Sequence, residues 1–322
     1  MTKIRVTVAM CTYNGERYVQ AQLDSIAAQT RSPDELVVHD DRSTDATLEV
    51  VRAFAARVSF PVRITINPVR LGSTTSFEHA IAAAEGQIIS LCDQDDVWRL
   101  DKLARIEAAF DAMPRVGCVF SDADVVGENL ERLGYRLWES VRLDHRKQRR
   151  MAAGAALEVL LQQNVVTGAT MALRSEFRDL VLPIPPGWVH DGWIALLAAA
   201  VGTCLPLNEP LVWYRQHAGQ QIGGLKRTLM QQVAAARTMD AAFFSQLAEN
   251  YRLARDRLAS SPNHRCSDAA LRKLDAKVAH CLARVDIRKT RRSPVAIAKE
   301  LISGRYHDYS LGWKSVASDL FL

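Results

Sequence analysis

Three carboxylates within four positions end an apolar stretch in the segment SLCDQDDVWRLDK, residues 90–102. The side chains of Asp93, Asp95 and Asp96 should be ionised at neutral pH, because ordinary carboxyl pKa values lie near 4. Two such charges about 5 Å apart repel by roughly 3 kcal/mol at an effective dielectric constant of 20. Carboxylate oxygens suit a hard divalent cation, Mg²⁺ or Mn²⁺, which commonly joins one or two carboxylates to substrate phosphates. We therefore expect Asp93 and Asp95 to bind a metal, whereas Asp96 could equally cap the following helix.

Two further polar clusters follow earlier predicted strands. Thr12, Tyr13 and Asn14 come after the first strand, and Asp40 and Asp41 come after the second. Ligands of mostly parallel sheets bind beyond the carboxyl ends of the strands. The three polar clusters should therefore meet at one edge of a sheet and form a binding site there. Asp41 is interpreted as a structural turn or capping residue.

Strands and helices alternate along the N-terminal part of the chain. Alternating or β-branched runs predict strands at residues 4–9, 35–39, 62–67, 87–92, 116–120 and 165–173. Apolar residues at helical spacing predict helices at residues 16–29, 43–57, 75–84, 100–112 and 193–207. This order predicts an α/β fold with a mostly parallel sheet and helices on both faces. Residues 225–322 are predicted to be mostly helical, with a polar break at 260–264.

Composition limits the class of protein. The chain has 322 residues, of which 48% are hydrophobic, enough for one large domain or one domain with an extension. Its six cysteines have no CxxC spacing, which favours reduced thiols in the cytoplasm. The N-terminus lacks the long apolar core of a signal peptide, and the apolar stretch at 193–207 is too short to span a membrane.

Charge divides the chain at residue 224. Residues 225–322 contain 18 Lys and Arg against 9 Asp and Glu, a net charge of +9, which leaves −4 of the total +5 for residues 1–224. No nucleic-acid-binding module accompanies the basic segment, so we expect no nucleic-acid partner. The segment could consist of ordinary solvated helices, or it could contact an anionic membrane surface. A membrane contact would use four basic side chains, Arg288, Lys289, Arg291 and Arg292. It would also use apolar and aromatic side chains at roughly helical spacing: Leu311, Trp313, Val316, Leu320, Phe321 and Leu322.

Several motifs together resemble a known family. VTVAMCTYNGERYVQAQLDSIAAQT, VVHDDRSTDAT and ISLCDQDDVWRLDKL resemble the N-terminal half of family 2 glycosyltransferases. HDGWIALLAAAVG and PLVWYRQHAGQQIG resemble later motifs of their rhamnosyltransferase-like branch. The resemblance covers about residues 4–223 and implies a GT-A fold, with a Rossmann-like sheet, that binds a nucleotide-diphospho-sugar. It therefore predicts a GT-A catalytic domain at 1–224 and a basic helical extension at 225–322.

The resemblance also implies roles for single residues. Thr12, Tyr13 and Asp40 would bind the pyrimidine and ribose of the donor. Asp93 would face ribose and metal, and Asp95 would bind the metal directly. The middle residue of this DxD motif is often small in the family, and we expect little consequence from Gln94.

The later motifs supply the remaining predicted site residues. Asp191 aligns with the family's general base, although it could also cap the helix that it begins. His190 precedes it where many relatives have Glu. Arg215 could neutralise the leaving diphosphate, with Arg70 as a second candidate. His217 could be a third metal ligand or a hydrogen-bonded structural residue. Thr167 to Thr170 resembles the segment under the donor sugar, where small residues permit close approach.

The resulting hypothesis is an inverting, metal-dependent glycosyltransferase that uses Mg²⁺ or Mn²⁺ and a single in-line displacement. A UDP- or dTDP-sugar, possibly of rhamnose, would be the donor. A lipid-linked saccharide in lipopolysaccharide (O-antigen) or exopolysaccharide synthesis would be the acceptor, with the protein on the cytoplasmic face of the inner membrane. Two alternatives remain. One is a catalytically silent scaffold of a polysaccharide assembly complex. The other is a sugar nucleotidyltransferase, which should carry a glycine-rich phosphate loop that CTYNGERY does not supply.

Overall fold

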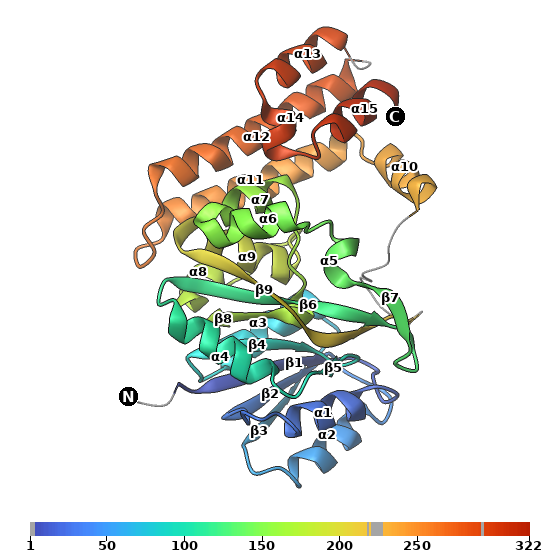
Figure 1. Cartoon of the computed structure of the whole chain (residues 1–322), viewed down its shortest axis with the longest axis vertical. Helices are drawn as coiled ribbons and strands as arrows, with labels where there is room; N and C mark the ends of the chain where they lie inside the picture. The colour runs from blue at the N-terminus through green and yellow to red at the C-terminus, as the bar shows by residue number, and fades with distance from the viewer. Residues whose placement is uncertain (1–3, 218, 220–227, 291–292) are drawn as a thin grey trace.

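A curled central sheet flanked by helices forms the lower part of the molecule in Figure 1, and a helical region forms the upper part. The computed structural model describes residues 4–217, 219, 228–290 and 293–322. Within these residues the sheet has nine strands. Their bounds are β1 Val6–Thr12, β2 Glu35–Asp40, β3 Val62–Ile66, β4 Ile88–Asp93, β5 Val97–Trp98, β6 Val116–Val126, β7 Arg132–Arg136, β8 Met171–Arg174 and β9 Thr203–Arg215.

The sheet order is β3-β2-β1-β4-β8-β6-β9-β5, and β7 pairs with β6. Strands β1 to β4 are parallel, β8 is antiparallel to both of its neighbours, and β9 is parallel to β6. Strand β1 is buried along its whole length, as expected for a central strand covered on both faces. In the register, Thr12 lies opposite Asp40 and Cys11 lies opposite Asp93. The mostly parallel sheet and the meeting of the polar strand ends are thus confirmed.

Helices cover both faces of the sheet and build the C-terminal region. Those within the first 217 residues are α1 Val19–Ala27, α2 Thr47–Ala55, α3 Ser73–Ala83, α4 Lys102–Ala112, α5 Leu137–Ser140, α6 His145–Arg150, α7 Ala156–Gln162, α8 Arg178–Val181 and α9 His190–Val201. The later ones are α10 Leu229–Arg237, α11 Ala241–Ser260, α12 Asp268–Lys289, α13 Pro294–Ile302, α14 Arg305–Tyr309 and α15 Trp313–Phe321. The predicted polar break at 260–264 separates α11 from α12.

Two predicted elements need correction. The strand expected at 165–173 begins only at Met171, after a 3-10 turn at Gly168–Thr170. The helix expected at 193–207 ends at Val201, and the chain then enters β9. The second error arises because a strand buried on both faces is as uniformly apolar as a buried helix, so periodicity does not separate them.

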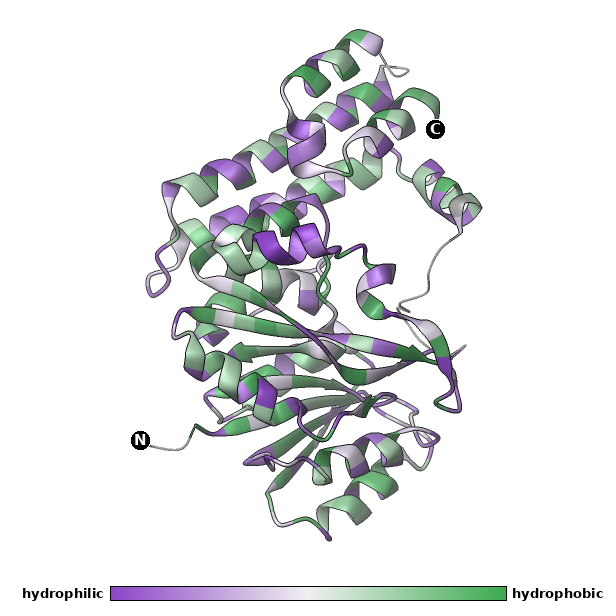
Figure 2. Ribbon diagram, in the orientation of Figure 1, coloured by the Kyte–Doolittle hydropathy of each residue, from purple (hydrophilic) through white to green (hydrophobic). Residues whose placement is uncertain are grey.

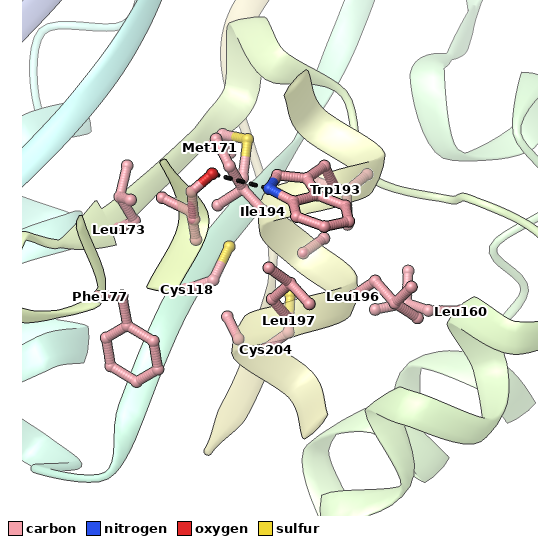
Figure 3. Close-up of a cluster of buried hydrophobic side chains, with 14 of the residues drawn as sticks. Cys118, Leu160, Met171, Leu173, Phe177, Trp193, Ile194, Leu196, Leu197 and Cys204 are labelled. Atoms are coloured by element: carbon pink, nitrogen blue, oxygen red, sulfur yellow. Dashed lines mark hydrogen bonds between the residues drawn. The ribbon is translucent and has the colours of Figure 1, made fainter. Parts of the chain in front are cut away.

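A continuous apolar core joins the sheet to α7 and α9 (Figure 3). Trp193 of α9 is fully buried, and its indole nitrogen donates a 2.7 Å hydrogen bond to the carbonyl of Val181. Figure 3 shows Met171 and Cys118 from the sheet beside Ile194 of the same helix. This packing fixes the position of α9, whose N-terminal end carries His190 and Asp191.

The C-terminal helices α11 and α12 share the main core. Buried residues of α11 and α12 belong to the same cluster as those of α7 and α9: Tyr251, Ala254, Leu258, Ala270 and Leu274. A second, smaller cluster lies farther along and consists of Ile287, Ile297, Tyr306 and Val316. The predicted boundary at 224/225 falls outside the described residues, as do Arg291 and Arg292, so the two-domain division stays a prediction.

No helix in the described parts of the chain has the length and apolar character that crossing a membrane requires.

Candidate active site

A cavity of about 630 Å³ opens where the ends of β1 and β4 meet the start of α9. Six of the eight predicted site residues line it: Thr12, Tyr13, Asp93, Asp95, Asp191 and His217. Segments separated by just over 200 positions, from Thr12 to His217, therefore contribute to one cavity. Asp40 and Arg215 are buried and do not line it.

Asp93 is the last residue of β4 and has a perturbed carboxyl group. Burial, followed by the negative charges of Asp95 and Asp191, raises the pKa of Asp93 to about 7, while the cation of Lys102 opposes the rise. The negative charge of Asp191 thus acts on the carboxyl group of Asp93, although the two residues lie almost one hundred positions apart in the sequence. An added cation would relieve the repulsion among these carboxylates.

Asp95 lies against His217, as expected if both bind a common ligand. The imidazole Nε2 of His217 is 2.8 Å from Oδ2 of Asp95. The His217 ring also stacks on Tyr18, with ring centroids 4.5 Å apart. The motif that supplies His217 continues into residues 220–223, which lie outside the described residues.

Gln94, the middle residue of the DxD motif, connects two loops of the site. Its Nε2 donates to the carbonyl of Tyr13, and its Oε1 accepts from the backbone N–H of Tyr13, both at 2.9 Å. Gly15 allows this approach, because a Cβ there would come within 2.1 Å of the Gln94 amide oxygen. The expectation of little consequence at position 94 was therefore wrong. A small residue could not make these two bonds.

Asp96 and Arg215 support the turn from behind. The buried carboxylate of Asp96 accepts a 2.9 Å hydrogen bond from the backbone N–H of Arg215. Nε of Arg215 donates to the carbonyl of Asp95 at 2.6 Å, and the guanidinium also donates to the carbonyl of Glu128. Two expectations are thus corrected. Asp101, not Asp96, occupies the N-cap of α4, and Arg215 faces the protein instead of the diphosphate.

Tyr214, the residue before Arg215, lines the cavity. The guanidinium of Arg215 lies behind the same wall, because its partners Asp95, Glu128 and Tyr18 line the cavity. Burial, and then the negative charges of Asp96, Asp93 and the neighbouring aspartates, raise the pKa of Tyr214 well above its usual value. Tyr214 is therefore a neutral phenol in the cavity wall. The sequence offered no signal for it.

Of the neighbouring residues Asp40 and Asp41, it is Asp41, and not Asp40 as had been expected, that reaches the cavity. Asp40 is fully buried and accepts from the hydroxyls of Thr12 and Ser43 at 2.7 and 2.6 Å. Asp41 lines the cavity, and its carboxylate accepts from the backbone N–H groups of Leu71 and Gly72. Asp41 therefore has the structural contacts that were expected, but it also forms part of the cavity wall.

Tyr13 presents its ring at the same end of the cavity. The guanidinium carbon of Arg70 lies 4.0 Å from the centroid of this ring. Arg70 is exposed and lines the cavity, so it places a cation where the predicted Arg215 does not. One face of the Tyr13 ring is therefore covered by Arg70.

Asp191 is held in the first turn of α9 by three donors. Oδ1 accepts from the side-chain amide of Asn164 at 3.0 Å and from the backbone N–H of Gly192, and Oδ2 accepts from the N–H of Gly168 at 3.2 Å. The N-cap of α9 is Val189, so the capping alternative for Asp191 is wrong. Asn164 has no motif around it in the sequence, and its role as an orienting donor could not be predicted.

His190 forms the wall beside Asp191. Both of its ring nitrogens are buried without a hydrogen-bond partner among the described residues, and its ring lies 4.2 Å from that of Phe77. A Cβ at Gly168 would come within 2.4 Å of Nε2 of His190, so only glycine permits this approach. Burial lowers the pKa of His190, and the ring is neutral near pH 7. The ring nitrogens of His190 are therefore buried within the wall, with Nε2 packed against Gly168.

The donor chemistry of the DxD turn fits a divalent metal. Among the described residues, no group of three or more His, Cys, Asp and Glu side chains is arranged to hold a metal ion. Mg²⁺-type sites need fewer protein ligands, because one or two carboxylates act together with substrate phosphates and water. Asp93 and Asp95 supply such a pair on the cavity wall, and the raised pKa of Asp93 reflects its burial first and then the neighbouring negative charges.

Part of the chain matches a known sequence family. Residues 7–165 match the sequence model described as glycosyl transferase family 2. An uncharacterized glycosyltransferase of Nostoc sp. is 28% identical over 218 residues, which are 66% of this chain and 65% of that relative. The matched region thus spans slightly less than two thirds of the relative's length.

Two shorter matches have more informative names. The UDP-Glc:alpha-D-GlcNAc-diphosphoundecaprenol beta-1,3-glucosyltransferase WfgD of Escherichia coli is 26% identical over 124 residues, 38% of this chain and 47% of WfgD. The dTDP-rhamnosyl transferase RfbG of Shigella flexneri is 33% identical over 127 residues, 38% of this chain and 40% of RfbG. Both matches cover well under half of this chain.

Solved structures share the fold at low sequence identity. S. aureus TarS in complex with UDP-GlcNAc has a TM-score of 0.58 and 17% identity, covering 86% of this chain and 72% of that one. The mannosyltransferase PcManGT of Pyrobaculum calidifontis, in complex with GDP-Man and Mn²⁺, has a TM-score of 0.55 and 18% identity, covering 99% and 85%. Residues 7–165, just under half of the chain, thus match glycosyl transferase family 2, and the chain shares the GT-A fold of these enzymes.

Proposed function

We propose that the protein is an inverting glycosyltransferase that moves a sugar from a nucleotide-diphospho-sugar to a saccharide hydroxyl. One observation carries the proposal: the carboxylate of Asp191 lines the same cavity as Asp93 and Asp95. This arrangement provides a base for the acceptor hydroxyl and an acidic pair for the donor's diphosphate end within one space. A catalytically silent scaffold would not need both.

The chemistry is a single in-line displacement. The acceptor oxygen forms a bond to the anomeric carbon as the bond from that carbon to the diphosphate oxygen breaks. The electron pair of the broken bond leaves with the nucleoside diphosphate. Asp191 accepts the hydroxyl proton, and Asn164 and the N–H of Gly168 hold its carboxylate in orientation. A base of this kind contributes about 10²- to 10⁴-fold to the rate.

The charge of the leaving group is balanced by groups at the opposite wall. A divalent metal held by Asp93 and Asp95, with His217 as a third candidate ligand, would neutralise the diphosphate. Arg70 adds a cation from this chain's own residues. We assign the nucleotide base to the end of the cavity formed by Tyr13, Thr12 and Asp41, in place of the buried Asp40. A carboxylate there could accept from the N3–H of uracil or thymine.

We favour UDP- or dTDP-linked donors and a lipid-linked acceptor. The names of two relatives support these choices. WfgD is named for a UDP-glucose donor and a diphosphoundecaprenol-linked acceptor, and RfbG is named as a dTDP-rhamnosyl transferase. An acceptor on a lipid carrier would place the protein on the cytoplasmic face of a membrane, in lipopolysaccharide or exopolysaccharide synthesis. The transferred sugar could then be rhamnose or another hexose.

Calorimetric titration of UDP and dTDP, with and without Mn²⁺, tests the donor site. We expect metal-dependent binding of one nucleotide that Asp95→Asn weakens at least about tenfold, since a carboxylate ligand is lost. Asp191→Asn should bind the same nucleotide normally but turn over about 10²- to 10⁴-fold more slowly. Full activity of Asp191→Asn would refute the assignment of the base. Failure to bind any pyrimidine or purine nucleotide would favour the scaffold alternative.

A further inference from the structure

Helices α13 and α15 differ from the usual surface helix, which turns mostly polar side chains toward solvent. Their exposed faces are mostly apolar, with a single lysine each: Pro294, Val295, Ala298, Lys299 and Ile302 on α13, and Trp313, Lys314, Ala317, Leu320 and Phe321 on α15. These positions recur at three- and four-residue spacing, so each set forms one side of its helix. Val295, Ile302, Trp313 and Phe321 are 66%, 86%, 66% and 76% exposed.

The acidic residues of the same helices point inward. The buried Glu300 of α13 contacts Nδ1 of His280 at 2.6 Å and accepts two hydrogen bonds from Arg305. The buried Asp319 of α15 accepts a bidentate pair from Arg284, both at 2.8 Å, and a further bond from the hydroxyl of Tyr306 at 2.7 Å. Each helix thus uses its carboxylate to hold the fold together.

The exposed apolar side chains of α13 and α15 therefore indicate a contact surface. Single apolar residues are common on protein surfaces and need no explanation. Here the apolar residues form the outer side of two helices whose acidic residues are turned inside, so the arrangement is not a scatter of single exposures. The two helices pack against each other, around the small core that contains Ile297 and Val316. Figure 1 shows them at the end of the molecule away from β1 to β4, and Figure 2 shows hydrophobic segments along both.

Part of this surface was anticipated from sequence. Leu311, Trp313, Leu320 and Phe321 are exposed as a membrane contact would require, whereas Val316 is buried in the small core and is removed from the set. Val295 and Ile302 of α13 were not foreseen, because a nine-residue helix with two exposed aliphatic residues has no distinctive pattern in the sequence.

We propose that the exposed faces of α13 and α15 dock on a membrane surface rich in anionic phospholipid. Aromatic and aliphatic side chains would enter the headgroup boundary, as they do in interfacial helices. Lys299 and Lys314 flank them with positive charge, and no carboxylate lies on either face within Pro294–Ile302 or Trp313–Phe321. Residues 225–322 carry a net charge of +9, which attracts an anionic leaflet and would repel an equally basic second copy of this segment.

Vesicle co-sedimentation of the full chain tests this docking. Vesicles of phosphatidylcholine with about one third phosphatidylglycerol should bind the protein, and pure phosphatidylcholine should bind it weakly. Replacing Ile302, Trp313 and Phe321 together by Ser should weaken binding to the mixed vesicles by about tenfold or more. The double variant Lys299→Gln/Lys314→Gln should lose most of the preference for anionic vesicles. Leu100→Ser removes an exposed leucine from the loop before α4 and should bind like the wild type.

Equal vesicle binding by the wild type and the triple Ser variant would overturn the proposal. So would a wild-type dimer, measured by light scattering, that the triple variant dissociates without any binding to vesicles. The inference does not depend on the proposed reaction. Calorimetric binding of UDP or dTDP to the triple variant separates the two, because loss of vesicle binding should leave nucleotide binding unchanged.

Discussion

Gln94 ties the acidic turn after β4 to the loop after β1. Its amide satisfies both backbone groups of Tyr13, so the ring proposed to stack on the base and the carboxylates proposed to bind metal are positioned together. Each such hydrogen bond contributes about 0.5–1.5 kcal/mol net. The two bonds therefore matter more for the geometry of the site than for global stability.

Substitution of Gln94 by Ala should weaken nucleotide binding in the presence of Mn²⁺ by about tenfold, because about 1–2 kcal/mol of positioning is lost. Titration calorimetry measures this change, and the thermal midpoint should move little. Gln20→Ala is the matched control, since Gln20 is exposed on α1 and its amide donates a hydrogen bond to Asp24 of the same helix. Unchanged affinity in Gln94→Ala would show that the two loops are positioned by other contacts.

At the scale of elements, α4 is fixed beneath the site by a buried lysine. Nζ of Lys102 donates a 2.9 Å hydrogen bond to the carbonyl of Ala169, in the 3-10 turn, and lies 3.6 Å from the centroid of the Trp98 ring. Lys102 is fully buried, and burial lowers its pKa to about 7, while the charges of Cys92, Asp96 and Asp93 oppose the fall. The folded protein therefore holds this proton less tightly than the unfolded chain does.

Lys102→Met tests the consequence for stability. Below pH 7 the lysine is protonated in both states, so its contribution does not change with pH. Above pH 7 the unfolded chain, with a lysine pKa near 10.4, binds more protons than the folded state, and wild-type stability rises relative to Lys102→Met. Between pH 7 and 8.5 the difference in unfolding free energy should shift by about 2 kcal/mol toward the wild type. Urea unfolding at the two pH values measures it, and a constant difference would contradict a lowered pKa.

The sequence predicts which strand ends meet, but not which of two neighbouring side chains faces the cavity. The order of strands and helices was enough to bring Thr12 and Asp93 together, whereas Asp191 was assigned through the family resemblance. Asp40 and Asp41, like Tyr214 and Arg215, are adjacent residues at a strand end, and a shift of one residue exchanges their faces. Contacts such as those of Asn164 and Gln94 depend on loop geometry that has no period, so only the structure reveals them.

At the scale of the whole molecule, α11 and α12 pack into the same core as α7 and α9. The basic segment is thus joined to the sheet region by buried apolar contacts and not only by the chain. A docking surface on α13 and α15 would then be held in a fixed relation to the active site, because α12 contacts both the main core and the small core. Such a connection would let membrane attachment orient the cavity toward a lipid-linked acceptor.

Leu274→Ala tests this connection. Leu274 of α12 is fully buried in the main core, so its truncation should cost about 2–5 kcal/mol through lost burial and the cavity that remains. If the segments unfold as one unit, helical circular dichroism and tryptophan fluorescence should shift together in urea, since Trp188 and Trp193 report on the neighbourhood of α9. Leu282→Ala, at an exposed position of the same helix, should change stability by less than about 0.5 kcal/mol. Two separate transitions, with the fluorescence change unaffected by Leu274→Ala, would instead favour an independent domain after residue 224, and the orientation of the cavity would then depend on the linker.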